Sequence, residues 1–103
     1  MSHHPRRNQR VDNNQKMIVD ALRTIPGVSV EPGHDDILVG YNRTGLTYWY
    51  EIKNEDAVSK KTGAIKPSEL TKTERDRILT WTGHYRVVWK LEQILEDMGI
   101  GVI

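Results

Sequence analysis

Asp36, Glu51 and Lys53 are the residues of this sequence best suited to carry out chemistry. Two carboxylates can hold a hard cation such as Mg²⁺, which prefers carboxylate, carbonyl and water oxygens as ligands. An ammonium group beside the cation can orient an attacking water molecule or help to remove its proton. Together these groups suit the hydrolysis of a phosphodiester, provided that the fold brings them to one place.

A β-hairpin would bring them together. One apolar run covers residues 37–41 and a second covers residues 46–52. Between them, the Asn-Arg-Thr-Gly sequence at residues 42–45 contains the Asn and Gly that favour a tight connection. If this connection is symmetric about its two central residues, Asp36 lies opposite Glu51 on the neighbouring strand.

Side chains alternate between the two faces of a strand, so this hairpin would have one apolar face and one mixed face. The apolar face would consist of Ile37, Val39, Tyr41, Leu46, Tyr48, Tyr50 and Ile52. The mixed face would carry Asp36, Leu38, Gly40, Thr47, Trp49, Glu51 and Lys53. Facing carboxylates about 5 Å apart repel by about 3 kcal/mol at an effective dielectric constant of about 20. A divalent cation between them would turn this penalty into a binding site.

The pattern Asp36…Glu51-Ile52-Lys53 on adjacent strands resembles the signature of the PD-(D/E)XK nucleases. The sequence GHDDILV at residues 33–39 is similar to the G-x-P-D-L-L-V run of the VRR-NUC and phage-type branch, with Asp in place of the proline. The resemblance implies Mg²⁺ as the cofactor, with Mn²⁺ able to substitute. It also implies that the main-chain carbonyl of Ile52 joins the two carboxylates as a metal ligand.

Gln15 and Glu74 each have two interpretations. Residues 10–15, RVDNNQ, look like the R-x-D-x-N-E segment of the family, and residues 70–74, LTKTE, look like its L-T-x-x-Q segment. Gln15 either completes a helix cap that Asp12 begins or leans toward the metal, as the resemblance implies. Glu74 either forms a capping box at the start of a helix or faces the site, as the resemblance implies.

The composition bounds the class of protein. The chain has 103 residues, enough for one domain, and contains no cysteine, which excludes disulfides and thiolate zinc sites. With 15 basic and 14 acidic residues the net charge is +1, which does not by itself indicate a nucleic-acid partner. No apolar run is as long as a membrane span or a signal peptide, so we expect no membrane partner. The phage-type resemblance implies the cytoplasm of a bacterial host cell.

Two local clusters of basic residues could contact DNA phosphates. The first lies in residues 1–10, which we expect to be a flexible polar tail. The second lies in residues 54–67, a polar loop long enough to fold over a bound substrate. The candidates for DNA contact are Arg7, Arg10, Lys60, Lys61 and Lys66. Both clusters are equally typical of ordinary solvated tails and loops.

The remaining patterns predict the elements around the hairpin, within a single domain over residues 11–103. Apolar residues at helical spacing predict helices over residues 12–25, 71–82 and 91–98, and β-rich segments predict strands over residues 28–30 and 85–89. The order α-β-β-β-α-β-α predicts an α/β (α+β) protein with a mixed central sheet flanked by helices. It resembles the restriction-endonuclease-like αβββαβ core of the PD-(D/E)XK fold. Residues 100–103 could add a strand or pair with a second subunit.

The favoured interpretation is a Mg²⁺-dependent endonuclease acting on duplex or branched DNA. No separate recognition module is present in the sequence, so we expect structure-selective or non-specific cutting, and a homodimer or higher homo-oligomer to cut both strands. The resemblance implies a phage or prophage origin and a role in DNA replication or recombination. The alternative is a non-cleaving DNA-end or junction-binding protein on a nuclease fold. Gln15 and Glu74 favour this alternative, because the resembled family more often has other residues at these positions. The facing carboxylates disfavour it, because binding alone does not need them.

Overall fold

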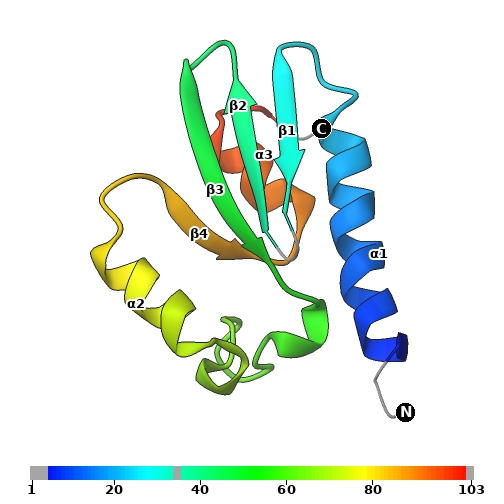
Figure 1. Ribbon diagram of the computed structural model, residues 1–103, viewed down its shortest axis with the longest axis vertical. Helices are drawn as coiled ribbons and strands as arrows, with labels where there is room; N and C mark the ends of the chain where they lie inside the picture. Colours follow the sequence, from blue (N-terminus) through cyan, green and yellow to red (C-terminus); the bar gives the residue numbers. More distant parts are fainter. Residues whose placement is uncertain (1–4, 34–35, 102–103) are drawn as a thin grey trace.

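The computed structural model describes the backbone of residues 5–33 and 36–101, and the side chains of these ranges from residue 14 onward. The elements of this part of the chain follow the order predicted from the sequence (Figure 1). They are α1 (Pro5–Leu22), β1 (Val28–Pro32), β2 (Asp36–Tyr41), β3 (Leu46–Ile52), α2 (Lys72–Thr80), β4 (Tyr85–Val88) and α3 (Leu91–Asp97). The predicted α/β class is confirmed.

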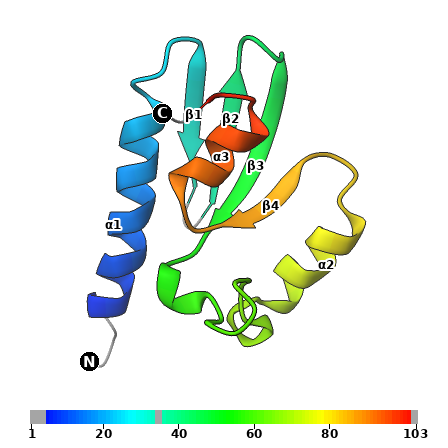
Figure 2. The ribbon, with the colours of Figure 1, turned by 180° about the vertical axis from the view of Figure 1, so that it is seen from behind.

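The strands form one mixed sheet in the order β1-β2-β3-β4. The first three are antiparallel neighbours, whereas β4 runs parallel to β3. A parallel pair requires a crossover connection, which α2 and the segment before it provide. Helix α3 lies against one face of the sheet and is seen in front of it in Figure 2, while α2 lies beside β4, far from α1.

The register of the β2–β3 hairpin agrees with the predicted register. Asp36 pairs with Glu51 at the open end, and Tyr41 pairs with Leu46 beside the turn. Gly45 has φ of 67°, in the left-handed region that favours glycine, and its N–H donates to the Tyr41 carbonyl at 2.8 Å. The turn therefore closes where the Asn-Arg-Thr-Gly sequence predicts, and this fixes which side chains share a face.

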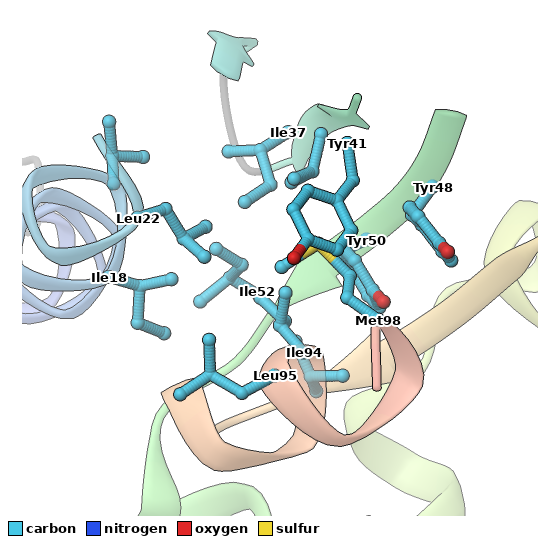
Figure 3. Close-up of a cluster of buried hydrophobic side chains, with 13 residues drawn as sticks. Ile18, Leu22, Ile37, Tyr41, Tyr48, Tyr50, Ile52, Ile94, Leu95 and Met98 are labelled. Atoms are coloured by element: carbon cyan, nitrogen blue, oxygen red, sulfur yellow. The ribbon is translucent and has the colours of Figure 1, made fainter. Parts of the chain in front are cut away.

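The apolar face of the hairpin packs against α1 and α3 to form the core, as the close-up in Figure 3 shows. Ile18 and Leu22 of α1 and Ile94 of α3 are fully buried there. The predicted apolar face is buried at every position except Leu46, which is 57% exposed. Leu46 begins β3 beside the turn, beyond the end of the buried cluster, so this member of the apolar face does not join the core.

The predicted start of the first helix at Asp12 is wrong, because α1 begins at Pro5. Proline suits the first helical position, and residues 6–25 contain no Gly or Pro that would interrupt a helix. The apolar spacing on which the prediction depended starts only at Ile18, so it missed this polar part. Residues 5–10 of the predicted tail are therefore helical, and residues 1–4 lie outside the described residues.

The segment after β3 is more ordered than the predicted loop. It contains the 3₁₀ turns η1 (Glu55–Ala57) and η2 (Pro67–Glu69), with an antiparallel bridge between Val58 and Ile65. Ala57 is buried, at 3% exposure. Backbone hydrogen bonds within the segment stabilise this local structure. A mostly polar sequence has no hydropathy pattern from which such bonds could be predicted.

Helix α2 is less buried than the predicted apolar stripe requires. The sequence predicts a short apolar stripe formed by Ile78 with either Trp81 or Thr82, but Ile78 and Trp81 are 47% and 51% exposed and Thr82 is exposed as well. The stripe is wrong because α2 buries Glu74 instead, which is 8% exposed. The predicted end of α3 is confirmed, since Gly99 follows it with φ of 76°.

Residues 100 and 101 do not extend the sheet, and the rest of the strand expected at residues 100–103 lies outside the described residues. Across the described part of the chain, no helix combines the length and apolar character needed to cross a membrane.

Candidate metal-ion site

The mixed face of the hairpin brings Asp36, Glu51 and Lys53 together at its open end. Asp36 and Glu51 are directly paired across β2 and β3, and Glu51 is 6% exposed. Lys53 follows β3 directly, and its N–H donates to the Val88 carbonyl of β4 at 2.9 Å. Its Nζ lies 4.0 Å from Glu51 Oε2 and 3.1 Å from Glu74 Oε1. The predicted catalytic residues therefore share one face, and Glu74 joins them.

Two neighbours hold the carboxylate of Asp36 in place. Trp49 Nε1 donates a hydrogen bond to Asp36 Oδ2 at 2.9 Å. Gly33 approaches so closely that a Cβ at this position would collide with Asp36 Oδ1, and its N–H donates to the Asp36 carbonyl at 2.7 Å. Carboxylates that bind metals are commonly oriented by such hydrogen bonds. The local structure therefore fixes the direction of one candidate ligand.

Gly33→Ala is expected to displace this carboxylate, because the added methyl group would occupy its position. The end of a short side chain can rotate away at a cost of about 0.5–1.5 kcal/mol, so the melting temperature should fall little. For the metal-dependent nuclease that the sequence predicts, a displaced ligand should slow DNA cleavage on the order of 10²-fold. The measurements are the cleavage rate and the melting temperature of each variant.

Gly40→Ala is the matched control, because an added methyl group there meets no described atom within 4 Å. It should change the cleavage rate by no more than about twofold, as for other substitutions away from a site. Equal rates for the two variants would show that the orientation of Asp36 does not matter.

Gln15 connects α1 to Gly33, which lies three residues before Asp36 in the sequence. Its Nε2 donates to the Gly33 carbonyl at 3.1 Å, and the side chain is buried. Its Oε1 is also buried and accepts no hydrogen bond from any residue that the structure describes. The cap interpretation is wrong, because Gln15 lies well inside α1. Its role beside a metal stays a prediction, which the partnerless oxygen favours.

Glu74 takes part in both of the arrangements that its sequence position suggests. Glu74 N–H donates to Thr71 Oγ1 at 3.1 Å and Thr71 N–H donates to Glu74 Oε1 at 3.0 Å, so the capping box is confirmed. The same Oε1 contacts Lys53 in the site. Burial alone would raise the pKa of Glu74, but the hydrogen bond from Thr71 and the charge of Lys53 outweigh it and lower the pKa below 4.5.

Acidification is expected to destabilise the folded protein partly through Glu74. Because its pKa is lower in the folded state, the unfolded chain takes up this proton first, and the free energy of unfolding falls as the pH drops below 4.5. Glu74→Gln removes this titration while it keeps an acceptor for Thr71. Its urea midpoint should therefore fall less than that of the wild type between about pH 6 and about pH 3.

Glu96→Gln, at an exposed position of α3, serves as the control for this titration and should follow the wild type. If Glu74→Gln loses as much stability in acid as the wild type does, the charge of Glu74 does not support the fold.

The sequence patterns missed an aromatic and cationic group beside the site. The Arg77 guanidinium carbon lies 4.2 Å from the centroid of the Trp49 ring and 5.3 Å from that of Tyr85. Trp49 also makes edge contacts with Trp81 and Tyr85, at centroid distances of 4.9 and 5.1 Å. Burial, followed by the nearby charge of Glu51, raises the pKa of Tyr85 to about 12. The sequence did contain a signal for this group. Arg77 and Trp81 follow Glu74 by three and seven residues, a spacing that places all three on one face of a helix.

In the described structure, no contact connects the predicted DNA-contact residues to the candidate site. Lys60, Lys61 and Lys66 are exposed, and Lys66 Nζ donates to the Asp56 carbonyl at 3.1 Å. Arg7 and Arg10 lie on α1, but their side chains fall outside the described part. Their role in DNA binding stays a prediction.

The donor set at this site suits Mg²⁺. Asp36 and Glu51 supply two carboxylates, and Gln15, whose Oε1 lacks a described partner, stays a predicted neutral ligand. Ile52 has a hydrocarbon side chain, which is buried in the core, so its main-chain carbonyl is the only oxygen that it could offer as a ligand. Among the described residues, no group of three or more His, Cys, Asp and Glu side chains has a metal-binding arrangement. An ion here would therefore depend on neutral oxygens and water as well as on carboxylates.

A groove of about 670 Å³ lies elsewhere, between α1, the segment after β3 and the start of α3. Met17, Asp56 and Trp89 are among its lining residues, and none of the predicted catalytic side chains lines it. Comparisons of the chain with models of protein families, with curated proteins and with solved structures found no match.

Proposed function

We propose that this protein is a Mg²⁺-dependent endonuclease that hydrolyses DNA phosphodiester bonds. The observation that carries the proposal is the facing pair of Asp36 and Glu51, with the Lys53 ammonium group 4.0 Å from one of them. Directly opposed carboxylates destabilise a sheet, so a purely structural hairpin has no use for them. A metal site does require such a pair, because it needs acidic ligands close together.

The residues divide the chemistry among themselves. Asp36, Glu51 and the carbonyl of Ile52 would hold Mg²⁺, or Mn²⁺ in its place. When bound, the ion would polarise the phosphate and stabilise the negative charge of the transition state. Lys53 would orient the attacking water molecule or help to remove its proton. Trp49 would keep the Asp36 carboxylate turned toward the site through its hydrogen bond.

The element order and the mixed sheet support the proposal, because they are those that the resemblance to PD-(D/E)XK nucleases implies. One chain supplies one such site, so cutting both strands of a duplex or a junction would require a homodimer. Without a separate recognition module, cutting would be structure-selective or non-specific. A phage or prophage origin, a role in replication or recombination and a bacterial cytoplasmic location belong to the same proposal.

One observation favours the alternative, a non-cleaving DNA-end or junction-binding protein. Lys53 Nζ lies closer to Glu74, at 3.1 Å, than to Glu51, at 4.0 Å. An ammonium group paired with Glu74 is less available to a water molecule. In this case the charged group would serve the capping and packing of α2 rather than catalysis.

A metal titration with supercoiled plasmid and a four-way junction separates the two functions. We expect nicking and linearisation that rise with Mg²⁺, stop in chelator and are lost in Glu51→Gln. Binding of the junction without any cleavage in Mg²⁺ or Mn²⁺ would establish the alternative instead.

A further inference from the structure

Trp81 occupies an unusual position for a large apolar side chain. It is 51% exposed at the C-terminal cap of α2, so it does not serve the core. Its ring contacts the Trp49 ring edge-to-face at a centroid distance of 4.9 Å and an interplanar angle of 81°. Gly83 gives it room, because an added Cβ there would lie 3.0 Å from Trp81 Nε1. The indole is therefore held in place while much of its surface remains open to solvent.

Trp49 joins this exposed ring to the candidate metal site. Its Nε1 donates to Asp36 Oδ2 at 2.9 Å, and its ring contacts Trp81. A single indole therefore separates a candidate metal ligand from the exposed indole of Trp81. The Arg77 guanidinium carbon lies 4.2 Å from the centroid of the same Trp49 ring and adds positive charge there. Two aromatic rings and a cation thus adjoin the place where a phosphodiester would be cut.

We propose that Trp81, supported by Trp49 and Arg77, stacks on an unpaired DNA base next to the scissile phosphate. The proposal rests on the proposed endonuclease function and names its substrate class as single-stranded or frayed DNA. Exposed aromatic rings bind bases of any sequence, because every base has a π-face. Bases inside a duplex have their faces covered by neighbouring pairs, so the base that stacks on Trp81 must be unpaired.

The test measures binding by fluorescence anisotropy in chelator, where no cleavage occurs, with a labelled single-stranded oligonucleotide and the matching duplex. Trp81→Ala should weaken binding to the single strand about tenfold, since stacking on one base accounts for an effect of this order. Its affinity for the duplex should change by less than about twofold. Trp81→Phe keeps a ring and should retain most of the affinity for the single strand.

Leu79→Ala is the matched control, because Leu79 is an apolar residue of the same helix that is 82% exposed. It should leave both affinities unchanged. A series of oligonucleotides with one abasic position provides a second measurement. At one position, loss of the base should weaken wild-type binding about as much as Trp81→Ala does, and Trp81→Ala should then show no further loss.

An absence of binding to the single strand, or an equal loss on single strand and duplex, would overturn the proposal. This failure is distinguishable from failure of the endonuclease function. In one outcome, the wild type cleaves plasmid while Trp81→Ala changes the affinities for single strand and duplex equally. In that case the endonuclease function would stand without the stacking site. Trp81-dependent binding without any metal-dependent cleavage would leave the stacking site standing without the nuclease.

Discussion

Lys53→Ala is expected to slow DNA cleavage about 10²–10³-fold, the usual loss when one electrostatic group of an active site is removed. The Lys53 ammonium group is the described cation that contacts both Glu51 and Glu74, and alanine cannot replace its charge. Affinity for DNA should fall little, because one phosphate contact is a small share of the total. The measurements are single-turnover cleavage rates and anisotropy on the same DNA.

Two variants separate catalysis by Lys53 from support of α2. Lys16→Ala removes an exposed lysine of α1 that has no predicted role in the site or in DNA binding, and it should leave the cleavage rate nearly unchanged. Glu74→Gln removes the ion pair with Lys53 but leaves the ammonium group in place. If Glu74→Gln slows cleavage as much as Lys53→Ala does, Lys53 acts through the position of α2 and not on the reacting water molecule.

Asp36→Asn is expected to melt at the same temperature as the wild type or higher when chelator is present. The substitution removes the repulsion with Glu51, and an asparagine oxygen can still accept the hydrogen bond from Trp49. Most substitutions destabilise a protein, so this result would be distinctive. Mg²⁺ at about tenfold above its dissociation constant should stabilise the wild type by about 1.4 kcal/mol.

The shift produced by Mg²⁺ should be much smaller for Asp36→Asn, because the variant has lost a charged ligand. Four melting curves decide the matter: two proteins, each in chelator and in millimolar Mg²⁺. A marked loss of stability for Asp36→Asn in chelator would mean that Asp36 is a structural hydrogen-bonding residue. Equal Mg²⁺ shifts in the two proteins would mean that the ion binds elsewhere.

The hairpin could be predicted from the sequence because its signals are local. Alternating apolar residues and a turn containing Asn and Gly are enough to pair Asp36 with Glu51, and Thr71 with Glu74 marks the start of α2 in the same way. The bond from Gln15 to Gly33 could not be predicted, because it depends on how α1 packs beside the sheet.

Three differences between the structure and the hydropathy pattern have a common physical origin in packing at the edges of the molecule. Leu46 lies beyond the end of the core and Trp81 lies at the end of α2, and both are apolar residues that remain more than half exposed. The polar start of α1, from Pro5, is helical without an apolar face that would reveal it. Hydropathy spacing reports burial, so it is weakest where an element extends past the core.

The parallel pairing of β3 with β4 has a consequence for the order of folding. The contacts between Asp36 and Glu51 are close in sequence, whereas β4 pairs with β3 only after a crossover of more than thirty residues. Contacts distant in sequence form more slowly, so we expect the hairpin to form before Glu74 reaches Lys53. During this interval the two carboxylates face each other without α2 beside them. A divalent cation present during synthesis could therefore act on the folding rate as well as on the folded protein.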